Sequence, residues 1–393
     1  MNKKLMALAI AGVMAVPLTA AADGTHVTIF GRLQAEYATV DVDGFNAQSA
    51  VSDDALQSRW GLQIAEDLGM GLQAIGRIEY ALNPGGDVHS TAREQWVGLR
   101  GDQWGELKFG RVQSVLRDFA GGLLVDAFAE TSLHANGSGG LMVSSANGYG
   151  SGEHGFVKSA VRYDSPVVEG FSVAGLLMPG DADKNDPVLG SVENAGGENG
   201  EWDFQIGAKY SGQFDIVGVD VFGAYSRDNV SKWQKLAGSS KDEQIWRGGA
   251  IISVEDFRLR GQYEHVIHAN PFGGAASCTE AAAFGDITAA GNNGRAQCNS
   301  AMNANGNGSL WIVGADYTIG NTMLVAQGGM TRAKSKGLVA KRDVENITVG
   351  VIHNLSRRSS LFGGYQRVWV DDKAVGVADS DRNVYSVGIR HDF

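Results

Sequence analysis

The sequence has few of the residues that interrupt or cross-link a chain: only 6 of its 393 residues are proline and only 2 are cysteine. No Pro/Ser-rich linker or block of charge divides it, so one large domain is a simpler interpretation than several. Basic residues are also few, with 33 Lys and Arg against 44 Asp and Glu, for a formal charge of −11. A nucleic-acid partner, which needs a basic surface, is therefore not expected.

Long apolar runs are missing beyond the first residues, and no later segment reaches the roughly 18 apolar residues that suggest a membrane-spanning helix. The first residues have the form of a secretion signal, because Lys3 and Lys4 precede an apolar run from Leu5 to Leu18 and small residues continue to Ala22. We expect cleavage after Ala22, which divides the chain into a signal peptide (1–22) and a mature domain (23–393). An uncleaved anchor is the alternative, but the run is shorter than a spanning helix needs.

Sequence signatures of catalysis are missing as well. There is no H-E-x-x-H, no Walker loop and no G-x-S-x-G, and the G-x-G-x-x-G match at 150–155 does not lie between a strand and a helix, as a dinucleotide site requires. His265 and His268 have a spacing that suits one face of a helix but not one face of a strand. We therefore expect no catalytic residues, no cofactor and no metal site.

What the sequence does contain is much glycine, 55 residues, and many short segments in which apolar and polar residues alternate. From Trp202 to Tyr210 one parity is apolar, with aromatic residues at both ends, and the other carries Asp, Gln, Gly and Lys. Residues 26–37, 72–80 and 385–390 alternate in the same way, with Phe30 as an exception on the polar side. This pattern is typical of strands that face lipid on one side and water on the other.

Twelve more such segments raise the number to sixteen. They are centred near Leu62, Leu99, Leu107, Val161, Val173, Val219, Ile251, Leu259, Val313, Val325, Val349 and Phe362. Compact turns, such as 66–71, alternate with long polar connections at 41–57, 179–200, 228–243 and 267–308. We therefore predict an all-β fold, a 16-stranded antiparallel transmembrane β-barrel, because lipid allows no unpaired strand edge. A soluble β-sandwich or jelly roll is the alternative, but it would hide its apolar faces in a core.

One long connection is not merely polar. Between Arg111 and Phe156, residues 118–128 carry apolar side chains that a solvated loop would avoid. We expect this segment to fold into the barrel and narrow it at mid-height, so that the pore filters by size and local charge. A partly ordered surface loop is the alternative.

Six segments, taken in order, carry a resemblance to a known family: Ser58–Gly61, Glu66–Ala74, Val97–Leu99, Phe109–Arg111, Val161–Pro166 and Gly388–Phe393. Together they resemble the general porins of Gram-negative outer membranes, over the whole mature chain. The resemblance implies a homotrimer in outer-membrane lipid, with an inward-folded third external loop, through which small hydrophilic solutes and ions diffuse passively. The terminal Phe393 is then the C-terminal assembly signal.

The resemblance also implies a basic wall in the pore that faces acidic residues on the inner loop, a charge arrangement that makes a transverse field across the pore. The basic residues are Arg59, Arg77, Arg111 and Arg162, and strand parity adds Arg32. Parity agrees for all of them except Arg111, which only a bend at its strand end would turn inward. The candidates for the acidic side are Asp118, Asp126 and Glu130.

Cys278 and Cys298 both lie in the connection 267–308 and are candidates for a disulfide in an exported protein, with free thiols or a metal pair as alternatives. The sequence does not indicate whether the pore prefers anions or cations. A solute-selective channel is a second interpretation, for which a row of lumen aromatics would be the sign. An outer-membrane hydrolase, which needs a Ser/His constellation, and an adhesin with long binding loops are interpretations from other classes.

Overall fold

A computed structural model of the chain describes residues 20–22, 24–52, 58–82, 84, 92–135, 155–179, 202–229, 242–269, 306–335, 340–372 and 381–393. Nearly all regular structure within these ranges is β-strand. No helix in them is long and apolar enough to span a membrane. Most of the expected signal peptide and both cysteines lie outside the described residues, so the cleavage site and the disulfide stay predictions.

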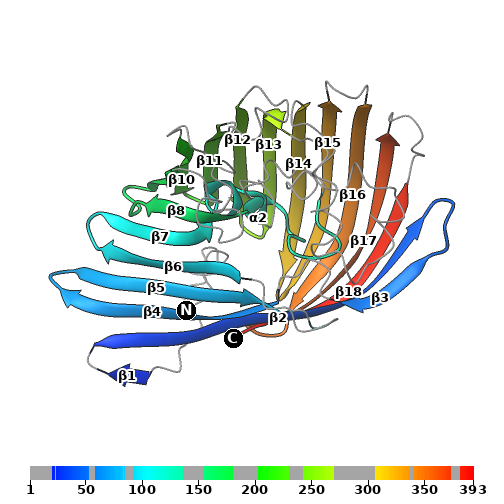
Figure 1. The fold of residues 1–393 in the computed structure, drawn as a ribbon. Coiled ribbons are helices and arrows are strands. Elements are labelled where there is room, and N and C mark those ends of the chain that lie inside the picture. The colour runs from blue at the N-terminus through cyan, green and yellow to red at the C-terminus, as the bar shows by residue number, and fades with distance from the viewer. Residues whose placement is uncertain are drawn as a thin grey trace, which may run out of the picture.

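Sixteen strands in the described part of the chain form one closed antiparallel ring (Figure 1), which confirms the predicted barrel. Each strand pairs with the next, and β18 pairs with β2 to close the ring. The ring strands are β2 (Thr25–Val42), β4 (Arg59–Gly69), β5 (Leu72–Ala81), β6 (Ala92–Gly101), β7 (Gly105–Gln113), β8 (Phe156–Asp164), β9 (Phe171–Pro179), β10 (Trp202–Phe214), β11 (Val217–Asp228), β12 (Glu243–Val254), β13 (Phe257–Ala269), β14 (Gly306–Ile319), β15 (Thr322–Ser335), β16 (Ala340–Asn354), β17 (Ser359–Asp372) and β18 (Arg382–Asp392).

Two short strands add to β2 outside the ring. β1 (Ala20–Ala22) pairs with its first residues, and β3 (Gln48–Ser52) pairs with residues 36–40. β3 lies within the connection 41–57, which the sequence analysis treats as a loop. β4 pairs only with residues 25–32 of β2, so the second half of β2 has an unpaired edge on this side. A strand forms in the connection because β3 pairs with that edge. Cleavage after Ala22 would remove β1.

The two faces of the wall follow the predicted alternation. On β2, Ile29, Leu33 and Tyr37 are exposed on the outside, whereas Gln34 and Glu36 between them are buried inside. The same alternation separates outward from inward residues along β10 and β18. An outer surface of exposed Trp, Tyr, Ile, Leu and Val is what a strand in lipid requires.

The connection after β7 lies inside the ring (Figure 1), as the sequence analysis expects. It begins with two single-turn helices, α1 (Val115–Asp118) and α2 (Gly122–Val125). We call residues 114–135 the inner loop. Its backbone is held by wall side chains, because Gln205 of β10 accepts a hydrogen bond from the Val115 N–H at 2.8 Å and Gln366 of β17 donates one to the His134 carbonyl at 2.8 Å.

The inner wall is not polar all round, although the alternation predicts polar residues on every inward face. On β9 to β14 many of the inward side chains are apolar and buried, and the inner loop packs against them, although buried polar side chains such as Gln205, Arg247 and Glu264 lie among them. The wall side of this core includes Leu176, Met178, Phe222, Ile245, Val266, Leu310 and Ile312, and the loop side includes Val115, Leu116, Phe119 and Val125. Where this arc is apolar, the inner loop replaces water as the neighbour of the wall, so the interior there is packed rather than wet.

Candidate functional site

Arginines gather on the inner face of the remaining arc. We call the following residues the basic cluster: Arg32 (β2), Arg59 (β4), Arg77 (β5), Arg93 (β6), Arg111 (β7), Arg117 (α1) and Arg390 (β18), together with the carboxylates Glu79, Glu94, Glu130 and Asp392. Arg32, Arg59 and Arg77 from the predicted basic wall all belong to it. Ion pairs and hydrogen bonds connect its members from β7 to β18.

Glu79 is the centre of one half of the basic cluster. Its buried carboxylate accepts hydrogen bonds from Arg93 Nε at 2.6 Å and from Arg77 Nη2, and it lies 3.8 Å from Arg59 Nε. Arg77 also pairs with Glu94 at 2.9 Å and lies over the ring of Phe30, 4.2 Å from its centroid. Phe30, the exception in the alternation, therefore supports an arginine.

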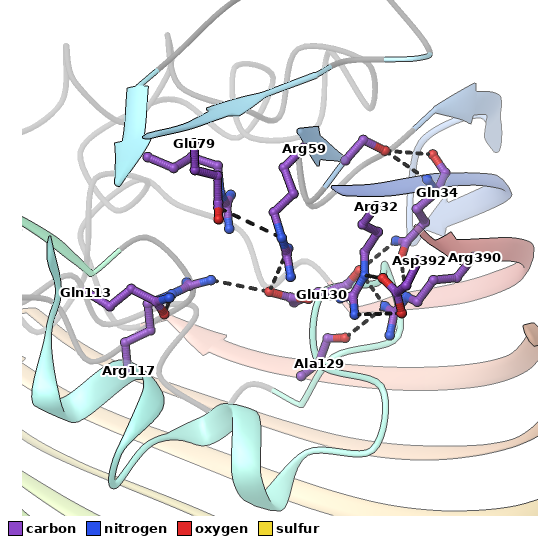
Figure 2. Close-up of polar contacts among 12 residues, drawn as sticks. Arg32, Gln34, Arg59, Glu79, Gln113, Arg117, Ala129, Glu130, Arg390 and Asp392 are labelled. Carbon is purple, nitrogen blue, oxygen red and sulfur yellow. Dashed lines mark hydrogen bonds and ion pairs between the residues drawn. The ribbon is translucent and has the colours of Figure 1, made fainter. Parts of the chain in front are cut away.

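Glu130, on the inner loop, is the centre of the other half (Figure 2). Its carboxylate pairs with Arg32 Nη1, with Arg117 Nη2 at 3.2 Å and with Arg59 Nη1 at 3.5 Å. Arg32 pairs in addition with Asp392 at 2.6 Å. Arg32 and Arg59 occupy directly opposite register positions on β2 and β4, where like charges are unfavourable. Glu130 supplies the negative charge between them.

The carboxyl of Glu130 has a strongly shifted pKa. Burial raises this pKa, but the charges of Arg59, Arg32, Arg117 and Arg390 together lower it, and the net direction is well below the usual range of a glutamate. Glu130 is thus a carboxylate at any physiological pH. Its pairing with the arginines does not depend on small changes in pH.

Arg162, on β8, belongs to a separate group. Its guanidinium pairs with Asp118 of α1 at 2.8 Å and with Asp164 at 2.7 Å, and Asp164 pairs in turn with Lys108 at 3.1 Å. The family resemblance implies that the loop acids face the arginines across the pore. In the structure Asp118 and Glu130 contact the arginines directly, because the inner loop lies against the wall.

Arg111 reaches the interior through a β-bulge. The pairing of β7 with β8 shifts between Gly110 and Val112, so Arg111 leaves the outward parity of its strand. Its Nε donates to the Arg93 carbonyl at 2.8 Å, and its guanidinium lies 5.7 Å from the centroid of the Phe156 ring. This is the bend that an inward Arg111 requires.

Asp126 lies elsewhere, and the structure does not bring it to the basic cluster. Its carboxylate accepts hydrogen bonds from Gln327 Nε2 of β15 at 2.6 Å and from the Phe128 and Ala135 N–H groups at 2.9 and 2.7 Å. These contacts close a turn of the inner loop and attach it to the wall. Asp126 therefore has an anchoring position rather than one beside the arginines.

Several members of the basic cluster are not found by sequence reasoning. Glu79 has the same parity as Arg77 and could have been found on that ground. Arg93 and Glu94 both lie opposite Glu79 at a second bulge, between β5 and β6, where alternation gives no guide. Arg117 lies on the inner loop, where no strand parity applies. Among the described residues, no group of three or more His, Cys, Asp or Glu could hold a metal ion.

A closed sixteen-stranded barrel with a lipid-type outer surface, an inner loop and a charged inner wall defines the class of outer-membrane channels. The model of the Gram-negative porin family matches residues 7–374, and the chain belongs to this family. It is a porin of the Gram-negative outer membrane, a channel through which small hydrophilic solutes diffuse passively. This confirms the family, fold, location and function that the sequence predicts.

Relatives support the assignment. The chain is 27% identical to a major outer membrane protein P.IB of Neisseria meningitidis over 362 residues, which are 86% of this chain and 95% of the relative. It is 30% identical to an outer membrane porin protein of Bordetella pertussis over 192 residues, but this match spans only 46% of that protein.

Solved structures share the fold. An anion-selective porin from Comamonas acidovorans has a TM-score of 0.62 at 19% identity, covering 94% of this chain and 100% of that one. OmpF of Salmonella typhi, in complex with daunomycin, has a TM-score of 0.62 at 13% identity, covering 96% and 100%. At these identities the likeness concerns the fold alone.

Proposed function

We propose that this porin prefers anions and that permeating ions pass along the basic cluster. On the arc from β9 to β14 the inner loop packs apolar side chains against the wall, and the Arg247–Glu264 ion pair there is fully buried, so this part of the wall offers little to an ion. The partly exposed arginines of the basic cluster and the Arg162 group lie on the arc from β2 to β8, with β18. An ion that has lost part of its hydration would follow the polar arc.

The observation that carries the proposal is the difference in exposure between the two signs of charge. The side chains of Arg32, Arg59 and Arg77 are 17%, 19% and 24% exposed, whereas those of Glu79, Glu130 and Glu94 are 2%, 7% and 8% exposed. These three guanidiniums therefore cover the three glutamates, whereas Arg93 and Arg117 are only 6% and 2% exposed and the Asp392 carboxylate is 20% exposed. An ion in the lumen would meet positive charge first.

The number of charges points the same way. The basic cluster joins seven arginines to four carboxylates, and among the described residues neither Arg111 nor Arg390 makes an ion pair with a carboxylate within 4 Å. Asp118 is the counter-example, because it is 32% exposed over the nearly buried Arg162. Its group is balanced by Arg162 and Lys108, so the excess charge of the two groups together is positive. The anion selectivity named for the Comamonas porin fits this direction.

The test is the reversal potential of the purified protein in planar bilayers, measured across a gradient of potassium chloride. We expect a sign that corresponds to chloride permeating faster than potassium. A potential of the opposite sign would refute the anion preference, although it would leave the channel function intact.

We also propose that the mature protein begins after Ala22 and assembles as a homotrimer in outer-membrane lipid. The porin family and the trimer form described for OmpT of Vibrio cholerae, a structural neighbour, support the trimer. Amino-terminal sequencing of protein extracted from the membrane, and its migration before and after heating, test the two points.

We propose finally that the chain is not an enzyme. The described residues include a Ser/His pair, since Ser359 Oγ lies 2.9 Å from His391 Nδ1 on neighbouring strands. Among the described residues no carboxylate contacts His391, so the pair lacks the third group that orients a catalytic imidazole. We expect no hydrolysis of ester substrates by the purified porin, and Ser359-dependent turnover would refute this.

A further inference from the structure

The basic cluster contains an anion site that the protein fills with its own side chain. We propose that the Glu130 carboxylate is a tethered occupant of a site for multivalent oxyanions, and that such an anion displaces it. The inference rests on the proposed passage of anions along this wall. It adds a binding site, the chemical class of its ligand and a consequence for the inner loop.

The site is built by four strongly basic groups from different parts of the chain. Arg32, Arg59 and Arg390 come from β2, β4 and β18, and Arg117 comes from α1 (Figure 2). Three of these guanidiniums pair with the carboxylate of Glu130, and Arg390 donates to the carbonyls of Ala129 and Glu130 at 3.3 and 3.4 Å. Planar forks of N–H donors are the groups that recognise carboxylate, sulfate and phosphate alike.

The arginines need an anion at this position whichever molecule supplies it. Arg32 and Arg59 are direct neighbours across two strands, and like charges in that arrangement repel. Asp392 neutralises Arg32 from one side at 2.6 Å but makes no contact with Arg59 among the described ion pairs. Removal of the Glu130 carboxylate would therefore leave a strong preference for another anion.

Glu130 is held there against a backbone cost. Its φ is +66°, in the left-handed region that residues other than glycine seldom adopt. Release of the carboxylate would let this residue relax. The rest of the inner loop would stay in place, because Asp126 is bound to Gln327 and the Leu133 and His134 carbonyls accept from Gln366.

A multivalent oxyanion is the occupant that competes best. A sulfate or phosphate ion carries more charge than one carboxylate and offers acceptor oxygens in several directions, as four converging guanidiniums require. Arg32 and Arg59 keep 17% and 19% of their side chains exposed, so an anion in the lumen can reach them. Chloride has a single charge and no such geometry.

The test is a titration of the chloride current with sulfate in planar bilayers. In the wild-type porin we expect sulfate to reduce the current saturably, because a bound divalent anion occupies the permeation path. Glu130→Gln keeps the shape of the side chain but removes the competing charge. Since the internal competitor loses its charge, we expect the half-blocking sulfate concentration to fall about tenfold.

Glu94→Gln is the matched control, because it also removes one carboxylate from the basic cluster but lies on Arg77 and not in the site. We expect it to change the half-blocking concentration less than about twofold, whereas Arg59→Gln should raise it about tenfold. An unchanged value in Glu130→Gln, or equal shifts in Glu130→Gln and Glu94→Gln, would overturn the proposal.

A second variant and a measurement without sulfate distinguish failure of the binding site from failure of the anion preference. If Glu130→Gln does not assemble, Glu130→Asp retains the charge on a shorter side chain, and we expect a half-blocking concentration below that of the wild type. A value equal to the wild type would again count against the site. The reversal potential without sulfate tests the anion preference alone, so a cation-selective channel that still shows the Glu130-dependent block would refute only the proposed preference.

Discussion

The contact between α1 and the wall offers a way to move the inner loop while the strands of the barrel keep their pairing. Gly207 lies on β10 directly beneath α1. A Cβ at this position would lie 2.8 Å from Val115 Cγ1 and 3.0 Å from Phe119 Cδ1, and both of these atoms belong to the inner loop. No backbone atom of the wall is among these close neighbours. Gly207→Ala should therefore push on the loop while the strands keep their pairing.

The size of the effect follows from the two distances. A methyl group forced into a packed site of this kind costs about 1–3 kcal/mol. If the inner loop avoids that cost by moving away from the wall, the population of molecules with a displaced loop rises roughly 5- to 150-fold. Because α1 carries Arg117 and Asp118, which pair with Glu130 and Arg162, displacement also loosens both charged groups.

The assay combines single-channel recording with a gel measurement of the unfolding temperature, which is the temperature above which the protein no longer migrates as the folded form. We expect Gly207→Ala to change the unit conductance and to increase current noise, with little change in the unfolding temperature. Gly175→Ala, on the neighbouring strand β9, is the matched control, because the nearest atom to its Cβ would be 4.0 Å away. A wild-type conductance in Gly207→Ala, or the same change in Gly175→Ala, would refute the reasoning.

Three other predictions concern the charged groups. Arg77→Ala and Arg162→Ala should each move the reversal potential towards cation selectivity, since each removes a positive charge and leaves carboxylates behind; unchanged potentials would exclude these arginines from the filter. The pKa of Glu130 is lowered, so its contribution to the fixed loop is present at every pH above the ordinary glutamate value of 4.5 and is lost only as the pH falls below it. Between pH 7 and pH 4.5 the conductance of the wild-type porin should therefore show no titration step that is missing in Glu130→Gln. A step of this kind would contradict the assignment of Glu130 as a carboxylate at physiological pH. Arg247 and Glu264 form a fully buried pair, and Arg247 also donates to the Leu116 carbonyl of α1. Arg247→Met should lower the free energy of unfolding by about 3–5 kcal/mol, and Arg247→Met with Glu264→Leu should recover much of it; a double variant as unstable as the single one would show that the loss does not come from an unpaired Glu264.

The two faces of the wall could be predicted from the sequence because apolar and polar residues alternate along the strands. Ile29, Leu33 and Tyr37 alternate with Gln34 and Glu36, and this parity alone separates the lipid face from the interior. Arg32, Arg59 and Arg77 follow from the same rule, since each lies on a regular part of its strand. The apolar content of residues 118–128 was a sufficient sign of a buried loop, because solvated loops avoid such residues.

The partners of the arginines were not open to prediction. Arg93 and Arg111 are turned inward at bulges, where one extra residue reverses the parity and no local signal marks the position. Asp118, Asp126 and Glu130 were equal candidates in the sequence. The path of the inner loop takes Glu130 to Arg32, Asp118 to Arg162 and Asp126 to Gln327, which are distant in sequence.

The amino-acid sequence by itself determined that this chain is a barrel with a lipid-facing outside and arginines on its inside. Residue parity along a strand is a local property, and a strand in lipid is stable only when its apolar side chains face outward. Only the tertiary structure decided which half of the interior is filled by the loop and which carboxylate meets which guanidinium. Those choices depend on contacts between β10, β15, β18 and residues 114–135, which become neighbours only when the ring closes.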